Sequence, residues 1–120
     1  MRKRILVADD DPAIADMLHE MLSDEGYDVE TQVSGQAVQQ MQERFPDLLF
    51  LDIRLSGMDG RTICRHLKSQ EATHHMPIII LSANKDTQRI AREAGADDFL
   101  TKPFEMEGLL ALVAKYLKSG

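Results

Sequence analysis

Five side chains that could carry chemistry stand where predicted strands end, namely Asp9, Asp10, Asp52, Ser82 and Lys102. The plainest case is Asp52, which closes the run Leu48–Asp52 of four apolar residues and one carboxylate. A short apolar run of this kind, with Pro before it and Gly after it, is typical of a strand buried on both faces. Chemistry in open α/β sheets gathers where such strands end. Asp52 is therefore the first candidate for a reactive group.

Three carboxylates, one hydroxyl and one ammonium, if brought together, have the composition of a site for phosphoryl chemistry. Two like charges about 4 Å apart repel by roughly 4 kcal/mol at the effective dielectric of a protein surface, so the acids need a counter-charge. A divalent cation supplies it, and ligands made only of oxygen favour Mg²⁺ or Mn²⁺ over zinc. Lys102 and Ser82 can each hold a phosphate oxygen, which leaves Asp52 as the nucleophile. The set predicts an acyl-phosphate site.

Strand and helix patterns alternate along the whole chain. Residues 4–8, 48–52 and 78–82 are apolar runs, 28–33 alternates as an edge strand does, and 98–101 is a short strand. The first helical pattern is the strongest, because Asp11 can cap it, Pro12 can open it and Gly26 can end it. The predicted helices cover residues 12–25, 35–44, 60–69, 86–94 and 106–117.

This alternation predicts a doubly wound (βα)5 fold with one five-stranded parallel sheet between two helical layers, a flavodoxin-like three-layer sandwich. The strongly apolar first strand belongs inside the sheet and the amphipathic second strand at its edge, which fits the strand order 2-1-3-4-5. In that order the ends of the first, third, fourth and fifth strands share one rim. The five candidate side chains meet at this rim.

Composition bounds the class of protein. The 120 residues are expected to form a single domain, residues 1–120, and the formal net charge of -6 argues against a nucleic-acid-binding surface. No segment reads as a signal peptide or a membrane span, and one cysteine, Cys64, fits a reducing compartment. The expected location is the cytoplasm.

The chain resembles the receiver domain of two-component response regulators, CheY-like proteins, over nearly its whole length. Four motifs carry the resemblance in order and spacing: Asp9-Asp10-Asp11-Pro12, then Asp52 with Gly57-Met58-Asp59-Gly60, then Ser82-Ala83, then Lys102-Pro103-Phe104. The resemblance implies that Asp52 is the phosphoacceptor and that Ser82 and Lys102 contact the phosphoryl group. It also implies Mg²⁺ ligands, which are Asp10, Asp9 through water, Asp52 and the backbone carbonyl of Arg54.

The same resemblance implies a signalling cycle. Such domains take a phosphoryl group from the phosphohistidine of a histidine kinase or phosphotransfer protein, catalyse the transfer themselves and slowly hydrolyse the product. Ser82 and Phe99 are the implied switch residues, and the surface of segments 86–94, 98–101 and 106–117 is expected to bind a downstream effector or to form a phosphorylation-dependent homodimer. Because Lys102 must turn back over the site, the Lys102–Pro103 peptide bond is predicted to be cis.

Three other functions compete with this interpretation. A phosphatase of the haloacid-dehalogenase type needs a second Asp two residues after the first, where this chain has Arg54. A flavin- or dinucleotide-binding protein needs a Gly- or Ser/Thr-rich loop after the first strand, where three aspartates would repel phosphate. A docking module that is never phosphorylated would not need the complete site. The sequence leaves open the kinase, the effector, the oligomeric state, the lifetime of the phosphoryl group, and whether the domain stands alone or belongs to a longer protein.

Overall fold

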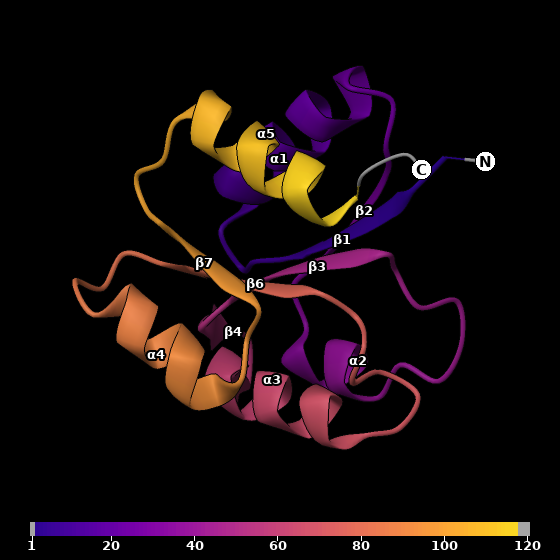
Figure 1. Cartoon of the computed structure of the whole chain (residues 1–120), viewed down its shortest axis with the longest axis vertical. Coiled ribbons are helices and arrows are strands. Elements are labelled where there is room, and N and C mark those ends of the chain that lie inside the picture. Colours follow the sequence, from indigo (N-terminus) through magenta and orange to yellow (C-terminus); the bar gives the residue numbers. More distant parts are fainter. Residues whose placement is uncertain (1, 118–120) are drawn as a thin grey trace.

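The computed structural model describes residues 2–117 and places the five main strands in one parallel sheet (Figure 1). Met1 and residues 118–120, which the predicted single domain includes, lie outside the described residues. The strand order is β2-β1-β3-β6-β7, which confirms the order expected from the sequence. The strands are β1 (Arg4–Ala8), β2 (Asp28–Gln32), β3 (Leu48–Asp52), β6 (Ile78–Ser82) and β7 (Asp98–Thr101).

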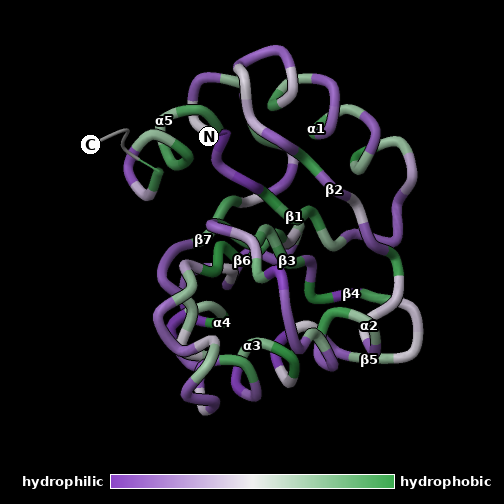
Figure 2. The backbone as a smooth tube through the Cα atoms, turned by 90° about the vertical axis from the view of Figure 1, so that its right-hand side faces the viewer, coloured by the Kyte–Doolittle hydropathy of each residue, from purple (hydrophilic) through white to green (hydrophobic). Residues whose placement is uncertain are grey.

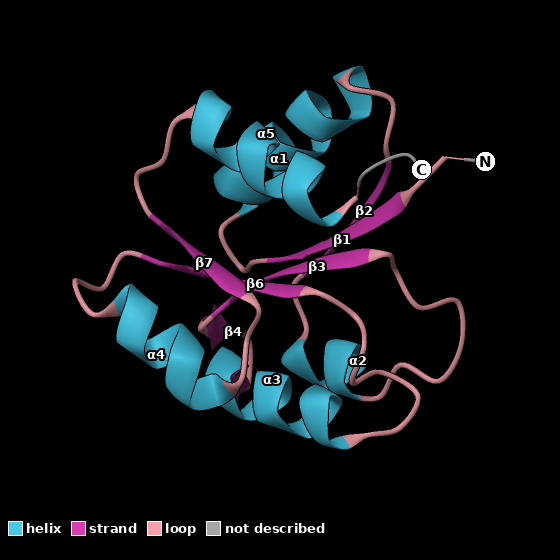
Figure 3. Cartoon of the chain, viewed as in Figure 1, coloured by secondary structure: helices cyan, strands magenta, loops and turns pink. Residues whose placement is uncertain are grey.

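Helices cover both faces of this sheet (Figure 3). In the view of Figure 1, α1 and α5 lie above the sheet, and α2, α3 and α4 lie below it. The three layers confirm the predicted sandwich. The helices are α1 (Pro12–Asp24), α2 (Gly35–Gln39), α3 (Gly60–Ser69), α4 (Thr87–Ala94) and α5 (Met106–Tyr116).

Alternate residues of the central strands pack into two separate hydrophobic cores, one on each face of the sheet. In β1, Ile5 and Val7 pack toward α1 and α5, whereas Leu6 and Ala8 pack toward the layer of α2, α3 and α4. The tube in Figure 2 accordingly shows hydrophobic stretches through the middle of the molecule and hydrophilic ones mainly on outer turns and loops. Burial on both faces explains why the runs in β1, β3 and β6 are continuously apolar.

Local sequence signals begin and end several helices as predicted. The carboxylate of Asp11 accepts a hydrogen bond from the amide of Ala13 at 3.0 Å, and that of Asp59 accepts one from Arg61 at 2.8 Å. These bonds satisfy amides that have no partner within the first turn of a helix. Gly26 follows α1 with a φ of 95°, a left-handed conformation that glycine adopts without strain.

The predicted helix over 35–44 is wrong beyond Gln39, where α2 ends. The guanidinium of Arg4 donates to the carbonyl of Arg44 at 2.6 Å and to that of Phe45 at 3.3 Å. Arg44 itself has a φ of 55°, outside the helical region. A contact with β1, distant in sequence, therefore overrides the helix propensity of residues 40–44.

A small hairpin after β3 was also not predicted. Strands β4 (Arg54–Leu55) and β5 (Met58–Asp59) pair antiparallel across Gly57, whose φ is 80°. The hairpin turns the chain back so that the start of α3 lies against the end of β3. There the amide of Gly60 donates to the carbonyl of Ile53 at 2.9 Å.

We predict that Gly60→Ala lowers the free energy of unfolding by about 3 kcal/mol or more. A Cβ at Gly60 would overlap the backbone carbonyl of Asp52 and approach the Cα of Ile53 to 2.8 Å, and neither backbone group can move aside. The control is Gly108→Ala on α5, where a Cβ meets nothing within 4 Å. Urea denaturation should show that this control gains about 0.5–1 kcal/mol. Equal stability of wild type and Gly60→Ala would contradict the close approach.

Candidate functional site

The carboxylates of Asp9, Asp10 and Asp52 meet at the rim where the parallel strands end. One oxygen from each lies within 4.8 Å of the others. Asp9 is completely buried, Asp52 is 6% exposed and Asp10 is exposed. The register pairs Ala8 of β1 with Leu51 of β3, so the residues that follow are neighbours. The structure thus brings together the three acids that the sequence singled out.

The ammonium of Lys102 lies between two of these acids. Its Nζ donates to Oδ2 of Asp9 and to Oδ2 of Asp52, at 2.8 Å in each case. Burial lowers the pKa of Lys102, but the bonds to Asp52 and Asp9 together raise it more, so the net shift is upward. Lys102 therefore stays charged and supplies a counter-charge to the acids, a role that the sequence analysis gave to a divalent cation.

The buried Asp9 carboxyl titrates well above the ordinary range. Burial raises its pKa from 3.8 to about 6, and the neighbouring Asp52 adds to the rise. The bonds from Lys102 and from the amide of Asp11 act in the opposite direction without cancelling the effect. The amide bond itself is 2.9 Å long and reaches Oδ1 of Asp9. Asp9 therefore holds its negative charge at a cost that a cation in the cleft would relieve.

Both carboxylate oxygens of Asp52 are held in place. Oδ1 accepts from the amide of Arg54 at 3.0 Å, and Oδ2 accepts from Lys102. Arg54 is exposed and lines the cleft, and its backbone amide is bonded to the Asp52 carboxylate. The predicted contribution of Arg54 as a ligand uses this backbone, through its carbonyl.

Ser82 reaches the same rim from the neighbouring strand. Register pairs Ser82 of β6 with Thr101 of β7, and the amide of Lys102 donates to the carbonyl of Ser82 at 2.8 Å. Oγ of Ser82 accepts from the amide of Asn84 at 3.0 Å, and the Ser82 residue is only 2% exposed. The Lys102–Pro103 peptide bond is cis, which confirms the prediction.

Except for the completely buried Asp9, these groups line a cleft of about 430 Å³. Its walls include Asp10, Asp52, Ser82 and Lys102 among the predicted residues, and Asn84. Phe99, the other predicted switch residue, is half-buried on β7 and packs against the core on the side of α2, α3 and α4. The donor set of carboxylates and backbone carbonyls is all oxygen, so it fits Mg²⁺ or Mn²⁺.

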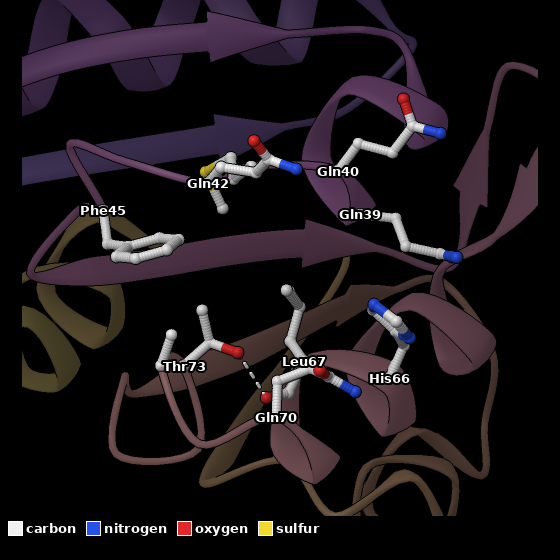
Figure 4. A pocket seen from close by; sticks show the side chains of 10 residues that line it. Gln39, Gln40, Gln42, Phe45, His66, Leu67, Gln70 and Thr73 are labelled. Carbon is white, nitrogen blue, oxygen red and sulfur yellow. Dashed lines mark hydrogen bonds between the residues drawn. The ribbon is translucent and has the colours of Figure 1, made fainter.

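A larger hollow of about 930 Å³ lies between α2 and α3, beside the segment that follows α2 (Figure 4). Its lining contains no Asp, Glu, Lys or Arg, and four of the ten residues are glutamines. The hydroxyl of Thr73 is already bonded to the carbonyl of Leu67 at 2.6 Å. The hollow therefore lacks the nucleophile and the charges that the smaller cleft has.

The sequence alone did not identify the role of Gly60. Its missing side chain lets α3 begin directly against the backbone of Asp52. The signal was the Gly57-Met58-Asp59-Gly60 motif, but only the folded hairpin shows what the second glycine is for. Of the helices within residues 2–117, none is long and apolar enough to cross a bilayer.

The model of the response regulator receiver domain family matches residues 5–114 of this chain. Among curated relatives, the DNA-binding dual master transcriptional regulator RpaA of Synechocystis sp. is 42% identical over 118 residues, which are 96% of this chain and 49% of RpaA. The DNA-binding response regulator MtrA of Mycolicibacterium smegmatis is 42% identical over 98% of this chain and 52% of MtrA. The chain thus spans about half the length of these relatives.

Solved structures share the fold closely. A putative response regulator from Chloroflexus aurantiacus superposes with a TM-score of 0.89 at 37% identity, over 97% of this chain and 98% of that one. The receiver domain of the sensor histidine kinase PA1611 from Pseudomonas aeruginosa gives a TM-score of 0.86 at 30% identity, over 97% and 98%. That structure has a magnesium ion coordinated in its active-site cleft.

We predict that Asp10→Asn raises the free energy of unfolding in EDTA by about 1 kcal/mol, because it removes one of three neighbouring negative charges. Within residues 2–117, no hydrogen bond or ion pair involves the carboxylate of Asp10, so little else is lost. The variant should also gain less stability than wild type from millimolar Mg²⁺. Denaturant titrations with and without Mg²⁺ measure both effects.

The matched control is Asp28→Asn, an exposed aspartate that pairs in register with Arg4 at the opposite end of the sheet. Its stability should stay within about 0.5 kcal/mol of wild type in both buffers. If Asp10→Asn proved less stable than wild type in EDTA, repulsion among the three acids would not be what limits the stability of the metal-free protein.

Proposed function

The chain belongs to the family of response regulator receiver domains, and from this premise we propose that Asp52 accepts a phosphoryl group from a phosphohistidine. The proposed receiver domain comprises residues 1–120. The observation that carries the proposal is the pair of bonds that orient Asp52, from Lys102 and from the amide of Arg54. They fix a nearly buried carboxylate at the floor of an open cleft, where a donor can reach it.

In the proposed reaction, a carboxylate oxygen of Asp52 attacks phosphorus as the bond from phosphorus to the imidazole nitrogen breaks. The electron pair of that bond stays on the imidazole, and the product is an acyl phosphate. Negative charge then moves outward from the carboxylate to the phosphoryl oxygens. The Lys102 ammonium, which donates to Asp52 in this structure, can then donate to a phosphoryl oxygen, and the Ser82 hydroxyl can donate to a second phosphoryl oxygen.

Four groups of the chain would hold Mg²⁺, or Mn²⁺ in its place: the carboxylates of Asp9, Asp10 and Asp52 and the backbone carbonyl of Arg54. The clustering of the three carboxylates within 4.8 Å supports this assignment. A bound ion neutralises charge on the phosphoryl oxygens during transfer. The domain is also proposed to hydrolyse its acyl phosphate slowly with water, so it would catalyse both its own phosphorylation by the donor and its own dephosphorylation.

Phosphorylation is proposed to change the surface formed by α4, β7 and α5. Ser82 and Phe99 are the proposed switch residues, since Ser82 lines the cleft and Phe99 is half-buried one strand away. At Phe99 the ring has no hydroxyl, so its position depends on packing alone. A downstream effector protein or domain would recognise the altered surface, and a second copy of the domain is the alternative partner.

The phosphodonor is proposed to be a histidine kinase or a phosphotransfer protein. Two curated relatives are named as DNA-binding regulators, but this chain matches only about half of each, and its net charge of -6 opposes direct contact with nucleic acid. We therefore expect any DNA binding to come from another domain or partner. The proposed location is the cytoplasm, where a reducing environment preserves the free, buried thiol of Cys64.

Asp52→Asn should abolish phosphorylation, because an amide cannot form the acyl phosphate. Intact-mass measurement after incubation with acetyl phosphate and Mg²⁺ tests this. The control is Asp59→Asn, which removes a carboxylate that caps α3 and replaces it with another good capping residue. The control should be labelled like wild type. An undiminished adduct on Asp52→Asn would refute the assignment, and an unlabelled wild type would favour the unphosphorylated docking module.

A further inference from the structure

One buried hydroxyl ties the start of α4 to the end of β6. Thr87 is the first residue of α4 and is only 1% exposed. Its Oγ1 donates to the carbonyl of Asn84 at 2.5 Å and lies 3.4 Å from the carbonyl of Ser82. A buried hydroxyl with two carbonyl contacts is a specific restraint on the loop between them.

The backbone of Asn84 is held at both its amide and its carbonyl. Its amide donates to Oγ of Ser82 at 3.0 Å, and its carbonyl accepts both from Oγ1 of Thr87 at 2.5 Å and from the backbone amide of Thr87 at 3.3 Å. Ser82 is among the residues that line the cleft, whereas Thr87 is buried and is not among them. A shift of Ser82 would therefore change the hydrogen bond to the Asn84 amide, whereas the Asn84 carbonyl is bonded to Thr87 at the start of α4.

The first turn of α4 has no ordinary side-chain cap. Asp86 occupies the N-cap position but makes no capping bond, and its carboxylate pairs instead with Arg89 at 3.1 Å. That pair is exposed and stabilises little. Instead, the amide of Asp86 donates to Oδ1 of Asn84 at 2.8 Å, and the Thr87 hydroxyl adds a side-chain bond between this turn and the loop before it.

The body of α4 is attached more weakly than that of α3. Its buried residues beyond Thr87 are one isoleucine, Ile90, and two alanines, Ala91 and Ala94. In α3 the side chains of Ile63, Cys64 and Leu67 are buried and bring more apolar surface to the core. Because α4 buries little apolar surface, we expect that displacing it costs less free energy than displacing α3.

We infer that Thr87 is a positioning residue whose hydroxyl transmits the movement of Ser82 on phosphorylation to α4. The inference rests on the proposed function, since it takes phosphorylation of Asp52 as the event that recruits Ser82. When the Ser82 hydroxyl turns to a phosphoryl oxygen, the bond from the Asn84 amide is released. Thr87 keeps its hold on the Asn84 carbonyl, so the loop and the first turn of α4 move together.

The test compares Thr87→Val, which keeps the shape but loses the hydroxyl, with Thr87→Ser, which keeps the hydroxyl. Each protein is treated with acetyl phosphate and Mg²⁺, intact mass gives the labelled fraction, and hydrogen exchange gives the protection of amides 87–94. In wild type and Thr87→Ser, phosphorylation should change α4 exchange by a factor of about three or more. Thr87→Val should be labelled equally but should lose most of this change.

A merely structural role for Thr87 would alter stability and leave the response of α4 to phosphorylation intact. A labelled Thr87→Val with the full wild-type response would therefore overturn the inference alone, and an unlabelled wild type would overturn the proposed function and the inference with it. Wild type provides a second measurement should Thr87→Val not fold. Its Asn84 amide should lose protection on phosphorylation as α4 exchange changes, and unchanged exchange at both places would overturn the inference.

Discussion

The Lys102 ammonium, 2.8 Å from both Asp9 and Asp52, is the interaction on which the site depends. Without Lys102, the buried carboxylates of Asp9 and Asp52 would repel each other and would lack the hydration that stabilises their charge. Removing one member of a buried ion pair leaves an uncompensated charge. The strand order places the ammonium beside these carboxylates, because β7 pairs with β6 and Lys102 is the first residue after β7. Lys102 lies 93 residues from Asp9 and 50 residues from Asp52 along the chain.

The same arrangement prepares the cleft for phosphoryl chemistry. In this structure Lys102 balances the negative charge of the Asp52 carboxylate. Phosphorylation would shift that charge to the phosphoryl oxygens, and the ammonium and the Ser82 hydroxyl would then bond to these oxygens. The rigid sheet holds the acids, whereas the loop after β6 and the lightly anchored α4 can respond. Under the proposed function, the buried strands hold the site in place and α4, which buries little apolar surface, is the element that shifts.

Sequence patterns were sufficient for the sheet and the site because both depend on where apolar strands end. Asp52 could be placed at the rim from five residues of sequence, and the apolar first strand and amphipathic second strand fitted the strand order that the structure has. The end of α2 could not be predicted, because it depends on a hydrogen bond to the carbonyl of Arg44 from Arg4, which lies 40 residues earlier in the chain. The contact of Lys102 with Asp9 was missed for the same reason, since no local pattern records which groups meet inside a cleft.

The most direct test of the role of Lys102 is the titration of the Asp9 carboxyl, followed by ¹³C NMR in EDTA. We expect a pKa of about 6 in the folded protein, against an ordinary value of 3.8. Because the folded state then binds this proton more tightly than the unfolded state, Asp9 should lower the free energy of unfolding as pH rises from about 4 to about 6. Lys102→Met should raise the pKa further. A pKa near 3.8 in wild type, unchanged in Lys102→Met, would contradict this electrostatic description of the site.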